Sequence, residues 1–115
     1  MWRRLLAKAL KHEEVFDALG NPVRREIMRI LAPGPRPVGE IASVLPVSRP
    51  AVSKHLRILE EAQLVAHDKQ GNRNVFRLER VGFDAARQWL EEFWDDALAR
   101  FVMVAENTRP REAKP

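Results

Sequence analysis

Apolar residues recur at the three- and four-residue spacing of a helix in five stretches of this chain. The first stretch, residues 2–19, predicts either one long amphipathic helix or a basic lead-in followed by a shorter helix. The second begins at Asn21 and Pro22, where asparagine suits the helix cap and proline the first helical position. It ends before residues 33–37, which contain three prolines and a glycine. The polar side chains of this second helix are expected to face outward: Arg24, Arg25, Glu26 and Arg29.

Two further predicted helices are separated by a very tight connection. Residues 38–45 predict a short helix, which residues 45–47 (LPV) break. A longer helix, capped by Ser48 and reaching Glu61, begins at once after them. The apolar stripe of the longer helix consists of Val52, Leu56 and Leu59. Its opposite face carries short hydroxyls and long cations, which suit phosphates and base edges: Arg49, Ser53, Lys54 and Arg57. This arrangement is typical of a helix-turn-helix, although a generic helical hairpin can share it.

Two predicted strands follow the longer helix. Residues 64–69 and 73–78 have the composition of strands, and residues 70–72 form a turn between them. A hairpin placed directly after a recognition helix is the wing of a winged helix. Its tip would present cations and an amide to backbone phosphates or to a minor groove: Lys69, Asn72 and Arg73. An ordinary solvated hairpin tip is the alternative.

The longest periodic segment covers residues 83–104. Its apolar stripe is broader than a helix needs when it covers one small core. Because aromatic residues are enriched at the cores of interfaces, this surplus favours a subunit interface over a ligand pocket. A cavity for a small apolar ligand, lined by Phe93, Trp94 and Phe101, is the alternative.

Length and charge add two constraints to this pattern. The chain has 115 residues, enough for one domain. We expect residues 1–11 to be a basic amphipathic extension, residues 12–106 the folded domain, and residues 107–115 a disordered tail.

Seven cations and four acids fall in residues 48–80, whereas residues 81–106 hold two cations and six acids. This distribution is an electrostatic footprint for a polyanion such as DNA, although scattered surface charges can also produce it.

Other function classes have little support in the sequence. No cysteine is present, which excludes disulfides and thiolate metal sites. There is no glycine-rich phosphate loop, nucleophile–base pair or set of metal ligands, so neither catalysis nor a cofactor is expected. No apolar run approaches the roughly 20 residues that a membrane span needs. We therefore expect a cytoplasmic protein without a membrane segment.

Four segments carry a family resemblance: residues 18–27 (ALGNPVRREI), 38–42 (VGEIA), 48–59 (SRPAVSKHLRIL) and 71–78 (GNRNVFRL). Together they resemble the ArsR family of bacterial winged-helix repressors, in register over roughly residues 12 to 80. The aromatic segment of the last helix, around Trp89 and Phe93, is similar to the metal-independent autorepressor-like branch. Within these segments, the run from Pro50 to Leu56 is specific to the family, whereas the hairpin alone is a weak signal.

The resemblance implies a mainly α fold with a small β-hairpin, in the order α-α-α-α-β-β-α. It also implies a homodimer closed by the first and last helices and a near-palindromic operator whose half-sites lie about one helical turn apart. The resemblance also implies that the bound protein represses transcription by blocking access to the promoter. The protein's own operon is one candidate target. The expected dimer contacts are Trp2, Leu6, Phe16, Trp89, Phe93, Trp94, Ala97 and Phe101. The expected contacts to double-stranded DNA are Ser48, Arg49, Ser53, Lys54, Arg57, Lys69, Asn72 and Arg73.

Several positions depart from the family's best-known members. The helix before the recognition helix has no cysteine pair and the last helix has no histidine, so metal sensing is not expected. Gln63 stands where relatives have glycine, and a positive φ there would cost glutamine roughly 1 kcal/mol. We expect His55 to be half-buried and bonded to a backbone group, and His12 and His67 to lie at the surface.

A second function remains open at this point. The same fold could serve as a protein-interaction module, with DNA binding controlled through the aromatic last helix. Control could come from sequestration by a protein co-regulator or from a small ligand.

Overall fold

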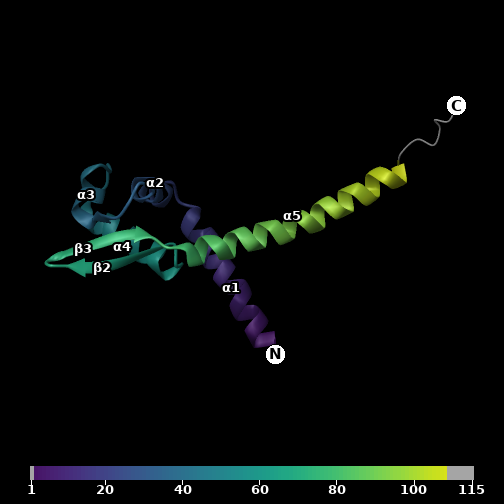
Figure 1. The fold of residues 1–115 in the computed structure, drawn as a ribbon, viewed down its shortest axis with the longest axis horizontal. Coiled ribbons are helices and arrows are strands. Elements are labelled where there is room, and N and C mark those ends of the chain that lie inside the picture. Colours follow the sequence, from purple (N-terminus) through teal and green to yellow (C-terminus); the bar gives the residue numbers. More distant parts are fainter. Residues whose placement is uncertain (1, 109–115) are drawn as a thin grey trace.

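The computed structural model describes the backbone of residues 2–108 and the side chains of residues 2, 3 and 12–108. The elements follow the order α1 (Trp2–Leu19), α2 (Pro22–Leu31), β1 (Arg36–Pro37), α3 (Val38–Ser43), α4 (Arg49–Glu61), β2 (Val65–Gln70), β3 (Arg73–Leu78) and α5 (Arg80–Thr108). In Figure 1 the short helices and the sheet form a body at one end, from which α1 and α5 extend in different directions. This is a winged helix-turn-helix, as the pattern and the family resemblance predicted.

The hydrophobic core lies where α1, α2, α3, α4 and the sheet meet. Apolar residues at helical spacing in each helix supply it, which is why an amphipathic pattern predicted these elements correctly. Its largest fully buried side chains are Ile27, Leu31, Ile41, Leu56, Leu59, Leu64, Val52 and Val65. Only the beginning of α5 joins this core, through Ala86.

Both predicted helix caps are confirmed. The side-chain oxygen of Asn21 accepts from the backbone N–H groups of Val23 and Arg24, at 2.9 and 3.1 Å. The hydroxyl of Ser48 accepts from the backbone N–H of Ala51 at 3.3 Å. Such contacts satisfy donors that have no intrahelical partner at the start of a helix. They fix where α2 and α4 begin.

The sheet has three antiparallel strands in the order β1-β3-β2. The second predicted hairpin strand is confirmed at residues 73–78, while the first lies one residue later than predicted. Gly71 in the turn has a φ of 63°, a conformation that glycine adopts without steric cost. The sequence did not predict β1, because two residues that include Pro37 show no alternation. Proline is tolerated there because β1 is an edge strand.

The two terminal helices are longer than a small core requires. α1 is continuous from Trp2 to Leu19, which decides between the two readings of the first stretch. α5 begins at Arg80, three residues before the predicted segment, and includes Asn107 and Thr108, which were predicted to open a disordered tail. Residues 109–115 of that predicted tail lie outside the described residues.

The turn after α4 contains Gln63, the position where relatives have glycine. The energetic cost of glutamine there depends on the sign of its φ angle. Gln63 has a φ of 58°, and it is the one non-glycine residue with positive φ among the described residues. Its carbonyl oxygen accepts from the backbone N–H of Gly82 in the first turn of α5, at 2.8 Å. A Cβ on Gly82 would lie 2.5 Å from the carbonyl oxygen of Ala62, so only glycine fits this close approach. The turn therefore sets where α5 leaves the body.

Candidate nucleic-acid interface

The α4 helix has two chemically opposite faces. Its apolar stripe is buried, with Val52, Leu56 and Leu59 each at most 1% exposed. All the polar residues predicted for its outer face are exposed: Ser48, Arg49, Ser53, Lys54 and Arg57. Within residues 12–108, Arg49, Lys54 and Arg57 take part in no ion pair. These cations can therefore bind phosphate oxygens without first losing an acidic partner.

The tip of the hairpin lies next to the beginning of α4. Lys69, Asn72 and Arg73 are exposed, and Asn72 and Arg73 line the same groove as Arg49. The groove has a volume of about 390 Å³ and is mostly polar. Its lining residues are Pro37, Val38, Gly39, Glu40, Arg49, Asn72, Arg73 and Asn74. The fold thus brings two predicted DNA-contacting elements, separated by the length of α4 and β2, to one surface.

Glu40 is an acidic side chain at this otherwise basic surface. One carboxylate oxygen lies 3.8 Å from Nη2 of Arg73, and the other lies 3.9 Å from Nη1 of Arg36. All three side chains are more than one third exposed, so these pairs contribute little to stability. Glu40 was not predicted to lie at this surface, because the hairpin tip that carries Arg73 is distant from it in the chain.

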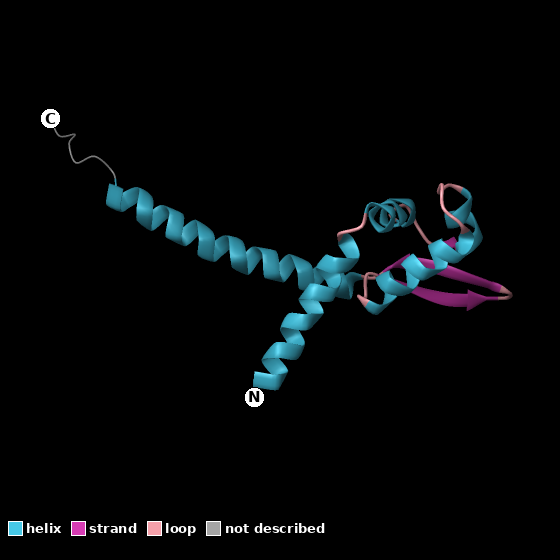
Figure 2. Ribbon diagram, turned by 180° about the vertical axis from the view of Figure 1, so that it is seen from behind, coloured by secondary structure: helices cyan, strands magenta, loops and turns pink. Residues whose placement is uncertain are grey.

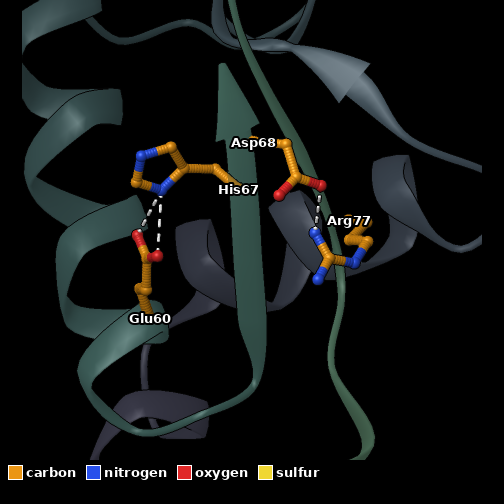
Figure 3. A network of polar contacts seen from close by, with 4 residues as sticks. All are labelled: Glu60, His67, Asp68 and Arg77. Carbon is orange, nitrogen blue, oxygen red and sulfur yellow. Dashed lines mark hydrogen bonds and ion pairs between the residues drawn. The ribbon is translucent and has the colours of Figure 1, made fainter. Parts of the chain in front are cut away.

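Polar contacts attach the base of the hairpin to the end of α4 (Figure 3). Nδ1 of His67 lies 2.8 and 2.9 Å from the two carboxylate oxygens of Glu60. The His67 ring also packs on Phe76 of β3, with ring centroids 4.9 Å apart. One residue further along β2, Asp68 accepts from Arg77 at 2.7 Å. The surface position predicted for His67 is correct, and its contacts hold β2 against α4.

His55 has a different partner from the one predicted. Its ring is half-buried, as expected, but Nδ1 lies 3.2 Å from Nη1 of Arg24, a side chain rather than a backbone group. Arg24 was expected to face outward with its neighbours on α2, and it is instead half-buried between helices. Burial, followed by the nearby charges of Arg24 and Lys54, lowers the pKa of His55 from its ordinary value of 6.5.

The predicted dimer residues lie on α1 and α5, the two helices that leave the body (Figure 2). Trp89 packs edge-to-face on Phe16 and stacks on Phe93, with ring centroids 5.3 Å apart in both pairs. Part of this aromatic cluster therefore joins α1 to α5 within one chain. The most exposed of the predicted dimer residues have exposed fractions of 57 to 70%: Trp2, Phe93, Trp94 and Phe101. Ala97 is half-buried, and the side chain of Leu6 lies outside the described residues.

An apolar groove of about 430 Å³ opens beside the beginning of α5. Its lining residues are Leu19, Phe83, Ala86, Arg87, Leu90, Glu91, Trp94 and Asp95. Of the three aromatic residues predicted to line a ligand cavity between the dimer helices, Trp94 borders this groove. The groove lies along the exposed apolar stripe of α5.

Metal clusters and membrane-spanning helices are both absent from the described residues. No group of three or more histidine, cysteine, aspartate or glutamate side chains is placed to hold a metal ion. None of the helices between residues 2 and 108 is long and apolar enough to cross a membrane.

Comparisons with known proteins agree with this geometry. A family model described as a helix-turn-helix domain matches residues 19–68. The HTH-type transcriptional regulator Rv2034 of Mycobacterium tuberculosis is 42% identical over 95 residues, which cover 83% of this chain and 89% of that protein. The crystal structure of an ArsR family transcriptional regulator is 30% identical, with a TM-score of 0.71, over 76% of this chain and 90% of the other.

A third comparison bears on assembly. The solution structure of Mb0332 from Mycobacterium bovis is described as a homodimeric winged helix-turn-helix DNA-binding domain of a possible ArsR-family regulator. It is 27% identical, with a TM-score of 0.65, and the match covers 96% of this chain and 94% of that domain.

Proposed function

The chain belongs to the ArsR family of winged helix-turn-helix transcriptional regulators, and we propose that it represses transcription by binding a near-palindromic operator as a homodimer. One observation carries this proposal. The polar face of α4 is exposed and its cations are unpaired among the described residues, while the hairpin tip borders the same groove. A bound dimer would cover promoter DNA and exclude the transcription machinery. Regulation of its own operon is one form that this repression could take.

Each DNA-facing residue has a proposed role. Arg49, at the start of α4, would read guanine through a bidentate contact in the major groove. Ser53 and Lys54 would contact base edges or phosphate, and Arg57 would bind phosphate. Ser48 already accepts a hydrogen bond as the helix cap, and its hydroxyl hydrogen can still donate to a phosphate oxygen. The residues at the hairpin tip would bind phosphates or enter the minor groove: Lys69, Asn72 and Arg73.

The proposed dimer interface is the exposed apolar surface of α1 and α5. Large side chains on one exposed helix are costly to leave in water and fit an interface core. The residues proposed to contact the second copy are Trp2, Leu6, Phe16, Trp89, Phe93, Trp94, Ala97 and Phe101. The acidic residues on α5 are exposed and would keep this end of the molecule away from DNA: Asp84, Glu91, Glu92, Asp95 and Asp96.

No metal or cofactor is part of the proposal, because α3 has no cysteine pair and α5 has no histidine at the family's known metal positions. A second candidate mechanism concerns control of DNA binding rather than DNA binding itself. The apolar groove of about 430 Å³ beside Trp94 could accept a small apolar ligand or a co-regulator protein. Such binding would act on the dimer helices and release the operator.

The proposal is tested by selecting duplexes that bind the protein from a random DNA library, and by footprinting its own upstream region. An inverted repeat with half-sites about one helical turn apart is the expected result. Gel-shift titrations then divide the roles. Arg49→Ala should reduce discrimination between operator and scrambled DNA by about 1–3 kcal/mol, whereas Arg73→Ala should weaken both equally. Equal losses on both duplexes for both variants would refute this division of roles.

A further inference from the structure

Arg24 joins three helices through one guanidinium group. Its Nε donates to the carbonyl oxygen of Ala18 at 2.7 Å, and its Nη2 donates to that of Asp17 at 3.1 Å. Both carbonyls belong to the last turn of α1, where few backbone donors are available; that of Asp17 also accepts from the backbone N–H of Gly20 at 3.2 Å. The remaining Nη1 lies 3.2 Å from Nδ1 of His55, in the middle of α4. One side chain on α2 thus connects the end of α1 to the helix proposed to read DNA.

The contact with His55 requires a neutral imidazole. A guanidinium group can only donate, so Nδ1 must accept and the ring hydrogen must reside on Nε2. A protonated ring carries hydrogens on both nitrogens and would direct an N–H at a cation. Burial lowers the pKa of His55 most, and the charged groups that lower it further are Arg24 from α2 and Lys54 from α4 itself. Among the described side chains, no acid from α1, α3 or β2 forms a hydrogen bond or ion pair with this ring.

We propose that Arg24 is a positioning residue that holds the rotation of α4 relative to α1 and makes DNA binding depend on a neutral His55. Buried residues on α4 are apolar, and their packing is much less directional than a hydrogen bond. If α1 closes the dimer, fixing α4 against α1 also fixes it against the recognition helix of the second copy. The inference rests on the proposed function, because this alignment matters only when two copies bind one operator.

Arg25 provides a matched control for Arg24. Its Nη1 donates to the carbonyl oxygen of Leu19 at 2.9 Å, so it caps the same end of α1. Unlike Arg24 it is exposed, and it makes no hydrogen bond to α4. Arg25→Met removes one cation and one capping hydrogen bond. Arg24→Met removes one cation, two capping hydrogen bonds and, in addition, the link to His55.

The first arm of the experiment measures binding of these variants to a selected duplex by fluorescence anisotropy. Arg24→Met should raise Kd by about tenfold, the equivalent of 1.4 kcal/mol, whereas Arg25→Met should stay within about twofold of the wild type. Equal losses in the two variants would overturn the positioning role. Circular dichroism melting records whether each variant is folded. Should Arg24→Met not fold, Arg24→Lys is compared with Arg25→Lys, because lysine keeps the charge but has one donor nitrogen.

The second arm follows Kd from about pH 8 to about pH 5. Protonation of a histidine adds positive charge, which by itself tightens binding to DNA. Loss of the Arg24 contact acts in the opposite direction once the pH falls below the pKa of His55, which burial and the neighbouring cations hold under the ordinary value of 6.5. The wild type should therefore lose affinity relative to His55→Gln as pH falls. In the Arg24→Met background, where only the added charge acts, the protein with His55 should lose no affinity relative to the protein with Gln. Parallel profiles for wild type and His55→Gln would overturn the pH dependence.

A third arm does not involve DNA. Nitrogen-15 NMR of the imidazole should show hydrogen on Nε2 of His55 in the wild type, and a mixture of tautomers in Arg24→Met. Unchanged tautomers would show that the contact does not form. If the wild type binds no selected duplex, the proposed function is wrong, and the positioning role in DNA binding fails with it. If the wild type binds and Arg24→Met binds equally well, only this inference is wrong.

Discussion

Replacing Gln63 with glycine should stabilise the protein. With a φ of 58°, Gln63 occupies the left-handed region, which costs a residue with a Cβ about 1–2 kcal/mol. Glycine removes this cost but adds flexibility to the unfolded chain, worth about 0.5–1 kcal/mol in the opposite direction. The substitution leaves the backbone hydrogen bonds of the turn in place, because they do not involve the replaced side chain. They are made by the N–H and C=O of residue 63 and by the N–H of Leu64. The net expectation for Gln63→Gly is a gain of about 0.5–1 kcal/mol in the free energy of unfolding.

The same substitution elsewhere in the chain provides the control. Gln70 is an exposed residue at the end of β2 and does not have a positive φ. Gln70→Gly should therefore destabilise the protein by about 0.5–1 kcal/mol, since glycine weakens a strand. Urea unfolding followed by circular dichroism measures both, at equal protein concentration because dimerisation affects stability. A loss of stability in Gln63→Gly similar to that in Gln70→Gly would refute the reasoning. DNA affinity should be unchanged in Gln63→Gly.

Three further substitutions test other contacts. Gly82→Ala should cost about 1–3 kcal/mol in urea unfolding, because its Cβ would lie 2.5 Å from a backbone oxygen of Ala62; wild-type stability would contradict the close approach. Glu40→Gln should tighten binding to all duplexes several-fold in anisotropy titrations, since it releases Arg73 and removes a negative charge facing phosphates; weaker binding would show that Glu40 positions Arg73 instead. Trp94→Glu should shift the protein to monomers in sedimentation and weaken operator binding, because it places a charge in the proposed interface; an unchanged dimer would exclude Trp94 from that interface.

Much of the fold could be predicted because local chemistry determined it. Asn21 and Ser48 cap their helices as expected, and helical periodicity located the core residues of α2 and α4. The glycine that relatives have at residue 63 raised two alternatives, a positive φ or a different turn, and the structure has the positive φ. Each of these features depends on residues close together in the chain, so a sequence pattern can report it.

The features that could not be predicted depend on contacts across the fold. Arg24 was assigned to an outer face because helical periodicity gives only its direction on α2. Its half-buried position arises because the end of α1 and the side chain of His55 meet there. Likewise, β1 exists only because β3 pairs with Arg36 and Pro37, which have no strand pattern of their own. Glu40 reaches the hairpin tip by the same long-range folding.

The central claim is that two copies of α4 and the hairpin tip bind DNA phosphates, and the salt dependence of binding to a selected operator tests it most directly. Three to five cations from each copy would give six to ten phosphate contacts, and a slope of log K against log salt of about −5 to −9. Substituting alanine for Arg57, Lys69 and Arg73 removes three cations per copy and should make the slope shallower by about 5. A wild-type slope shallower than about −2, or a triple variant with an unchanged slope, would contradict the account.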